Sequence, residues 1–155
     1  MDFRRANEKD IPMIHELLRQ VNLVHYLGRP DLFKKANKYT DDELKEILQD
    51  DTRPIFATTD ENDRMIAYAF CIHQQHIDDN LLTDIKTLYI DDLCVDENKR
   101  GLHIGKGLYE YVLKWAKDNG YYNVTLNVWS LNESAKRFYE SVGMKPYKIG
   151  MEQIL

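Results

Sequence analysis

Hydrophobic positions along the chain recur with two different periods, and these periods divide it into helices and strands. Residues 2–6 predict a short first strand. Residues 7–21 predict a helix, because apolar positions recur every three or four residues and Asn7 can cap the first turn. Residues 22–39 are less regular and are interrupted by Gly28 and a proline, so we expect an irregular segment there.

The pattern then changes from a helical period to strands. Residues 40–51 predict a second helix, with Thr40 as cap and Glu43 completing a capping box. Residues 53–59 and 65–75 are apolar and separated by a polar turn, which predicts a β-hairpin.

Strands and helices alternate in the second half of the chain. The expected elements are a strand at 85–95, a helix from Ile104 to the Asn119–Gly120 stop, a strand at 121–130, a helix at 131–142 and a closing strand at 145–155. We find no repeat, low-complexity tract or linker, so residues 1–155 are expected to form a single α/β (α+β) domain.

Composition narrows the function classes. Hydrophobic residues make up 43% of the chain and charged residues 30%, with a formal net charge of −5. This balance argues against general nucleic-acid binding and against an anionic membrane surface. Cys71 and Cys94 lie in apolar strand-like segments, which favours buried thiols over a disulfide and a cytoplasmic location over secretion. We identify no signal peptide and no apolar segment of the roughly 20 residues that a membrane helix needs.

The most unusual segment is "NKRGLHIGKGLYE", residues 98–110, which joins a strand to a helix. It contains three glycines, Gly101, Gly105 and Gly107, together with Arg100 and Lys106. The first N–H groups of a helix have no partner inside it, and the helix dipole adds about half a positive charge there. Glycines let an anion approach the backbone closely, so this turn predicts a phosphate or pyrophosphate site.

Two common phosphate motifs do not fit this turn. The dinucleotide fingerprint G-x-G-x-x-G is absent, and the P-loop pattern fails because Gly101 and Gly105 are one residue too close and Gly107 stands where Ser or Thr is needed. The alternative interpretation is a glycine turn that only tightens a strand-to-helix joint.

The segment around this turn resembles motif A of the GNAT family of N-acetyltransferases. The family signature is Arg/Gln-x-x-Gly-x-Gly/Ala, and Arg100 and Gly105 match its first and last positions. His103 stands where the family usually has glycine.

A second motif follows in the order that the family requires. "LNVWSLNESAKRFYESVGM" resembles motif B, whose Asn-x-x-Ala-x-x-Phe-Tyr core is met by Asn132, Ala135, Phe138 and Tyr139. The resemblance covers residues 86–145 and agrees elsewhere in element order only.

The resemblance implies acetyl-CoA as cofactor and transfer of its acetyl group to an amine. It implies the GNAT fold, a central mixed, mostly antiparallel sheet that splays in the middle, with helices on both faces. The pantetheine arm would pair with the splayed strand and the pyrophosphate would sit on the turn. The implied cofactor-binding residues are Leu93, Cys94, Val95, Arg100, Gly101, Leu102, His103, Ile104, Gly105, Lys106, Gly107, Asn132, Ala135 and Phe138.

Amine acylation sets its own chemical requirements. A lysine-like amine has a pKa of about 10.4, so a base must take its proton at neutral pH, directly or through water. A phenol with a pKa of about 10 is matched closely enough to a thiol of about 8.5 to protonate the departing sulfur. The resemblance assigns this general acid to Tyr139. The alternative is a core aromatic beside Phe138.

Asp91 and Asp92 are candidates for the base, because carboxylates are unfavourable inside so apolar a strand. In a regular strand Asp91 would share a face with Tyr89, and Asp92 with Cys94, although a bulge would change this. "YIDDLCV" is similar to the "YLEDFFV" of polyamine-type members, whose Glu lines the acceptor site, and the match falls on Asp91. Hydrogen-bonded or strand-edge carboxylates are the alternative.

The acceptor itself is not specified by the sequence. Residues 78–97 contain seven acids against one lysine, a field that suits a cationic small-molecule or peptide amine but equally a solvated surface. His25, Tyr26, Arg29, Phe33 and Asp92 are the candidate acceptor-site residues. Arg29 can hold a substrate carboxylate or pair with Asp31. No set of ligands suggests a metal.

Three classes of function therefore remain. The first is an N-acetyltransferase acting by direct attack. The second is a non-catalytic acyl-CoA binding module of the same fold, and the third is a phosphate-binding module unrelated to CoA. The apolar C-terminal segment can pair across a homodimer, which the sequence does not decide.

Overall fold

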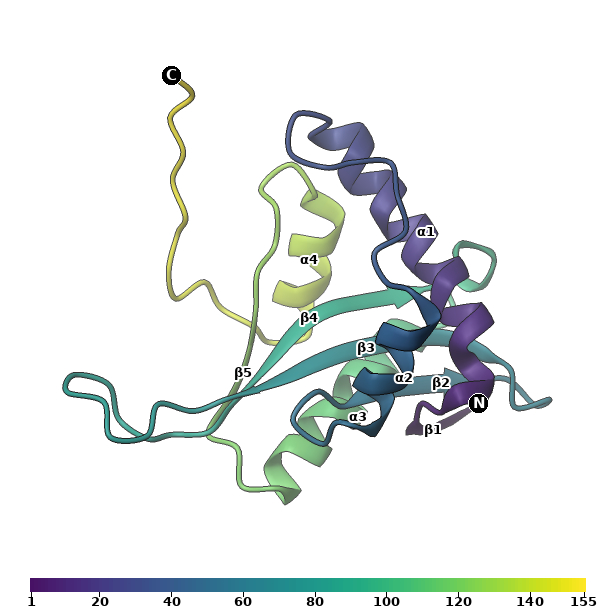
Figure 1. The fold of residues 1–155 in the computed structure, drawn as a ribbon, viewed down its shortest axis with the longest axis horizontal. Helices are drawn as coiled ribbons and strands as arrows, with labels where there is room; N and C mark the ends of the chain where they lie inside the picture. The colour runs from purple at the N-terminus through teal and green to yellow at the C-terminus, as the bar shows by residue number, and fades with distance from the viewer.

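The computed structural model describes all residues from 1 to 155 (Figure 1). Its elements, in chain order, are β1 (Asp2–Arg5), α1 (Ile11–Gly28), α2 (Asp41–Gln49), β2 (Ile55–Thr59), β3 (Met65–Gln74), β4 (Thr87–Val95), α3 (Ile104–Asp118), β5 (Asn123–Leu126) and α4 (Glu133–Ser141). Short 3-10 helices at Glu8–Asp10 and Glu97–Lys99 precede α1 and follow β4. No helix is both long enough and apolar enough to cross a bilayer.

The five strands form one sheet in the order β1-β2-β3-β4-β5. All neighbours are antiparallel except β4 and β5, which are parallel. Helices α1 and α2 cover one face, and α3 covers the other (Figure 1). The predicted mixed, mostly antiparallel sheet with helices on both faces is confirmed.

Each face of the sheet has its own core. On the α1/α2 side, Ile14 and Leu17 of α1 and Leu44 of α2 are fully buried with Tyr68 of β3. On the α3 side, apolar residues of that helix pack on the opposite face of the strands; they include Leu108, Val112, Phe56, Leu88 and Ile90. Cys94 belongs to the first core and Cys71 to the second, and both are buried free thiols, as predicted.

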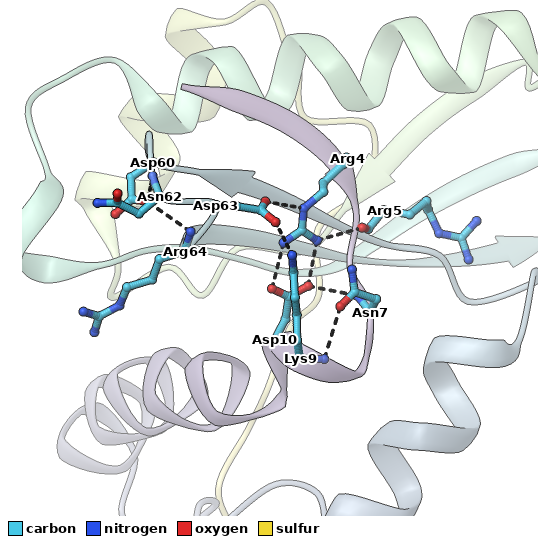
Figure 2. Close-up of polar contacts among 9 residues, drawn as sticks. All are labelled: Arg4, Arg5, Asn7, Lys9, Asp10, Asp60, Asn62, Asp63 and Arg64. Carbon is cyan, nitrogen blue, oxygen red and sulfur yellow. Dashed lines mark hydrogen bonds and ion pairs between the residues drawn. The ribbon is translucent and has the colours of Figure 1, made fainter.

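The N-terminal elements are held by a cluster of charges (Figure 2). The guanidinium of Arg4 donates to both oxygens of Asp10, at 2.8 and 2.9 Å, and to Asp63 at 2.9 Å. Lys9 also pairs with Asp63. The cluster therefore ties β1 and the start of α1 to the β2–β3 turn.

Strands β4 and β5 separate after a short common stretch. Their pairing runs only from Thr87–Asn123 to Ile90–Leu126. Strand β4 then continues to Val95, whereas the chain after β5 turns away towards α4 (Figure 1). The edge of β4 from Asp91 to Val95 is therefore unpaired on the side that faces β5.

A bulge interrupts β4 at the same place. Phe70 pairs with Asp92 and Cys71 pairs with Ile90, so Asp91 is an extra residue without a partner on β3. The parity that would put Asp91 and Asp92 on opposite faces is consequently wrong. Asp91 contacts Lys38 and Asp92 contacts Tyr68, so both carboxylates meet groups on the α1/α2 side.

Two predicted boundaries differ from the structure. Residues 22–28 are helical and extend α1, which continues through the segment expected to be irregular and ends at Gly28. A Cβ at Gly28 would lie 2.8 Å from Leu131, so glycine permits a close contact with the segment before α4. The strand expected at 121–130 is paired only over Asn123–Leu126, because the chain leaves the sheet after Leu126.

The predicted strand at residues 145–155 is wrong. This segment, the C-terminal arm, forms no backbone hydrogen bond and extends away from the sheet after Gly143, which has a φ of 101° (Figure 1). Within the chain its side-chain tie is the ion pair of Glu152 with Arg29. The alternation of apolar residues is that of a strand, but no strand of the same chain lies beside it.

Candidate active site

A large groove lies where β4 and β5 separate. Its volume is about 2580 Å³, several times the roughly 300–1,000 Å³ of a site for a drug-sized ligand. The walls come from the end of α1 and the loop after it, from β4, from the turn before α3, from α4 and from the C-terminal arm. The groove therefore has room for a long ligand and a second reactant.

The glycine turn forms one end of this groove. Gly101 has a φ of 86° and His103 a φ of 56°, so both adopt left-handed conformations. His103 gives α3 no side-chain cap, which leaves the amides of Ile104, Gly105 and Lys106 without protein partners. These free donors, beside the unpaired guanidinium of Arg100, suit an anion.

Not every residue of the turn faces the groove. Arg100, Gly101, His103, Ile104, Gly105 and Lys106 line it, whereas Leu102 and Gly107 do not. A Cβ at Gly105 would touch Phe138 and Val95 at 3.4 Å, so this glycine lets α3, α4 and β4 meet closely. A Cβ at Gly107 would lie 2.9 Å from Phe3, which gives that glycine a packing role against β1.

Tyr139 enters the groove from α4, which Asn132 caps by accepting a hydrogen bond from Ala135 at 3.2 Å. The Tyr139 ring packs on Phe138 and edge-on against Tyr109. Its hydroxyl has no hydrogen-bond partner within the chain. Burial, followed by the nearby charge of Asp92, raises the pKa of Tyr139 well above its usual value. The phenol therefore keeps its proton at neutral pH, and the chain leaves its hydroxyl free to contact a ligand.

The two carboxylates at the bulge have different partners. Asp91 accepts a hydrogen bond from the Lys38 ammonium at 3.0 Å. Asp92 accepts one from the Tyr68 hydroxyl at 2.5 Å. Burial raises the pKa of Asp92 to about 6, against the opposing effects of the Tyr68 hydrogen bond and the charge of Lys38. One carboxylate is thus already bound to an amine, and the other titrates near neutrality.

Aromatic rings form another wall of the groove. His25 of α1 stacks on Phe33 at 5.0 Å between ring centroids, and Phe33 meets Trp129 edge-on at 5.5 Å. Burial, and then the charge of Lys38, lower the pKa of His25. Tyr26 does not line the groove. Arg29 is engaged by both Asp31 and Glu152, so the predicted pairing with Asp31 is present.

Three further groove or support residues were not identified from the sequence: Lys38, Tyr68 and Trp129. Lys38 stands in a polar loop with no local motif, and Tyr68 looks like any apolar strand residue. Trp129 lies shortly after β5, and no sequence motif assigns it to a site. Only the folded chain brings them to the bulge and the wall.

Comparisons with known proteins agree with this architecture. The acetyltransferase (GNAT) family profile matches residues 21–144. Human N-acetyltransferase 8B is 39% identical over 69 residues, which are 44% of this chain and 30% of that protein. The chain thus matches less than a third of the length of this curated relative.

Solved structures extend the likeness to the whole chain. The crystal structure of a mutant of the BH1408 protein from Bacillus halodurans has a TM-score of 0.95 at 30% identity, covering 100% of this chain and 99% of that one. Aminoglycoside N-acetyltransferase AAC(6')-Iy in complex with CoA has a TM-score of 0.72 at 16% identity, covering 99% and 98%, and shares the fold. With a family profile matching most of its length and a splayed sheet of the same kind, the chain belongs to the acetyltransferase (GNAT) family.

Proposed function

We propose that the chain is an acetyl-CoA-dependent N-acetyltransferase that modifies a primary amine of a small molecule or peptide. The observation that carries this proposal is one groove containing three parts: the uncapped start of α3, a tyrosine that keeps its proton, and a carboxylate already bound to an amine. Anion binding, proton donation and amine recognition are the functions that the transfer needs.

The residues present fit the cofactor that the family implies. The unpaired edge of β4 at Leu93, Cys94 and Val95 offers backbone groups to an extended arm. The free amides of the turn, with Arg100 and Lys106, suit a pyrophosphate. Asn132, Ala135 and Phe138 face the same groove. Acetyl-CoA would supply an activated acetyl thioester there.

The chain's own groups would move the protons. Asp91 takes a proton from the acceptor ammonium, directly or through water, and the Lys38 contact supports this role because it places an ammonium against that carboxylate. Tyr139 holds a proton on its hydroxyl for the thiolate that leaves. Asp92 adds negative charge beside both groups.

The acceptor we propose is a cationic amine. Two carboxylates and an aromatic wall of His25, Phe33 and Trp129 form a site that attracts a positive charge and packs against an apolar or sugar-like body. The name of the relative AAC(6')-Iy includes aminoglycosides, which are polyamines, and they therefore belong in the set of amines to be tried.

The test is release of CoA from acetyl-CoA with polyamines, amino acids, aminoglycosides and N-terminal peptides. Tyr139→Phe is expected to lower kcat by about tenfold or more, because the mutant cannot donate the proton. Tyr122→Phe is the matched control, since Tyr122 is exposed and outside the groove, and it should behave as wild type.

Two results would contradict the proposal in different ways. Equal turnover by Tyr139→Phe and wild type would remove Tyr139 as the acid and leave the transferase assignment standing. Tight acetyl-CoA binding without turnover of any amine would favour a non-catalytic acyl-CoA binding module.

A further inference from the structure

The loop between α1 and α2 carries an amine of the chain itself to the bulge of β4. Lys38 Nζ lies 3.0 Å from Asp91 Oδ2, although the two residues are 53 positions apart. The side chain is 36% exposed, and Lys38 lines the same groove as Tyr139 and the glycine turn. An ammonium therefore already occupies the place where the acceptor amine has to give up its proton.

Asp91 holds this ammonium directly, and the charge of Asp92 adds to its stabilisation. Burial works against its charge, but Asp91, and after it Tyr39 and Asp92, outweigh that effect, and the pKa of Lys38 is raised. Asp92 in turn is close enough to Tyr139 to raise the pKa of its hydroxyl. Lys38, Asp91, Asp92 and Tyr139 thus all line the same groove.

We infer that Lys38 is an acetyl acceptor within the chain itself, and that its amine fills the acceptor seat until it is acetylated. This inference rests on the proposed acetyltransferase function. Once acetyl-CoA is bound, an amine that is part of the chain reacts within a single complex, which removes much of the entropic cost of bringing a separate acceptor to the site.

The transfer balances without any further reactant. The Lys38 ammonium loses one proton through Asp91 to solvent, and the neutral nitrogen forms a bond to the acetyl carbonyl carbon. The carbon–sulfur bond breaks, and the sulfur leaves with the electron pair. The second proton lost by the nitrogen balances the one that Tyr139 gives to the sulfur. The products are N-acetyl-lysine, CoA with a free thiol, and one released proton.

Acetylation would also change the loop. An amide nitrogen carries no charge, so the ion pair with Asp91 is lost and the carboxylate is exposed to an external amine. Apart from the Lys38–Asp91 contact with β4, the polar contact that ties residues 34–39 to the rest of the chain is a 3.5 Å hydrogen bond from Asn22 of α1 to the carbonyl of Ala36. Self-acetylation would therefore free the acceptor seat.

The first experiment is incubation of the purified protein with acetyl-CoA and no added amine, followed by intact mass and peptide mapping. We expect one acetyl group per chain, on Lys38. It should be absent in Lys38→Arg, present in the matched control Lys35→Arg from the same loop, and formed about tenfold or more slowly in Tyr139→Phe.

The second experiment needs no acetyl-CoA. Binding of spermidine to the ligand-free protein is measured by calorimetry for wild type, Lys38→Arg and Lys38→Gln, the last of which lacks the charge as acetyl-lysine does. If Lys38 fills the seat, Lys38→Gln should bind spermidine at least about tenfold more tightly than Lys38→Arg, because an ion pair of about 1.4 kcal/mol no longer competes.

The outcomes separate this inference from the proposed function. An unmodified Lys38 in a protein that acetylates an external amine overturns the inference alone. Acetyl groups spread over exposed lysines at a rate that Tyr139→Phe does not change would be non-enzymatic and would overturn it as well. If neither Lys38 nor any amine is acetylated, both proposals fall. Equal spermidine binding by the two variants removes Lys38 from the acceptor seat.

Discussion

At the scale of single residues, the bulge at Asp91 decides the chemistry of the site. It turns two neighbouring carboxylates to one side, where Lys38 binds the first and Tyr68 the second. The sequence indicated that carboxylates in so apolar a strand have a use, but it did not place them together. A bulge depends on pairing with β3, which local periodicity does not report.

Asp92 leads to a prediction about stability and pH. Its pKa is about 6 in the folded chain, raised from 3.8, so the folded state binds the proton more tightly than the unfolded one. Stability from this group is therefore greatest below pH 4, falls as the pH rises from about 4 to 6, and is constant above that range. The full change is about 3 kcal/mol at most.

Asp92→Asn should remove this dependence. The difference in unfolding free energy between the mutant and wild type, from urea titrations at pH 4, 5, 6 and 8, should shift in favour of the mutant as the pH rises. An amide oxygen can still accept the Tyr68 hydrogen bond, which limits other losses. A difference that stays constant across this range would mean that Asp92 titrates normally.

At the scale of elements, the turn before α3 combines free backbone amides with backbone strain. The sequence indicated that His103 departs from the glycine of the family signature, and the structure gives it a φ of 56°. A left-handed conformation costs a non-glycine residue about 1–2 kcal/mol. Replacement by glycine removes this cost but also increases the conformational entropy of the unfolded chain, which offsets part of the gain.

We therefore predict that His103→Gly stabilises the protein by up to about 1 kcal/mol and keeps CoA affinity, because the pyrophosphate contacts that we propose for this turn are to backbone amides. Thermal unfolding and CoA titration measure the two effects. Gly101→Ala is the opposite control: a φ of 86° makes alanine strained, so it should destabilise. A His103→Gly protein that loses CoA affinity would instead assign a binding role to the imidazole.

Elements with strong local signals could be predicted from the sequence, and elements set by distant contacts could not. Thr40 and Glu43 form the expected capping box, and α3 begins at Ile104 as expected. The family motifs directed attention to Tyr139, which does line the groove. Lys38 was missed because its role comes from a contact 53 residues away.

At the scale of the whole molecule, the C-terminal arm is the segment that lacks packing partners within a single chain. Tyr147, Ile149 and Met151 are 66%, 79% and 90% exposed, and the outer edge of β5 has no partner. The BH1408 crystal structure matches the full chain with a TM-score of 0.95, which leaves little room for an arm that takes another course. An open strand edge and an apolar strand-like arm favour pairing between two copies.

We predict a homodimer in which each arm pairs with the partner, as the apolar pattern of the sequence allows. Light scattering after size-exclusion chromatography should give twice the mass of the chain, and deletion of residues 146–155 should give a monomer. The double substitution Ile149→Asp and Met151→Asp keeps the length and should weaken the dimer equally. A full-length chain that is monomeric at micromolar concentration would contradict this prediction.

The reactivity of the two buried cysteines can be used to measure local unfolding of the protein. Cys94 lies in the core beneath α1 and α2, and burial raises the pKa of its thiol to about 12, while Cys71 lies in the core beneath α3. Since only thiolates react with disulfide reagents, a colorimetric thiol assay of the proposed reaction would detect the thiol of CoA and not the thiols of the chain while the chain stays folded. When one cysteine is replaced, the rate at which the remaining thiol reacts with excess reagent measures how fast its side of the sheet becomes exposed. Unequal rates would show that one face of the sheet uncovers before the other.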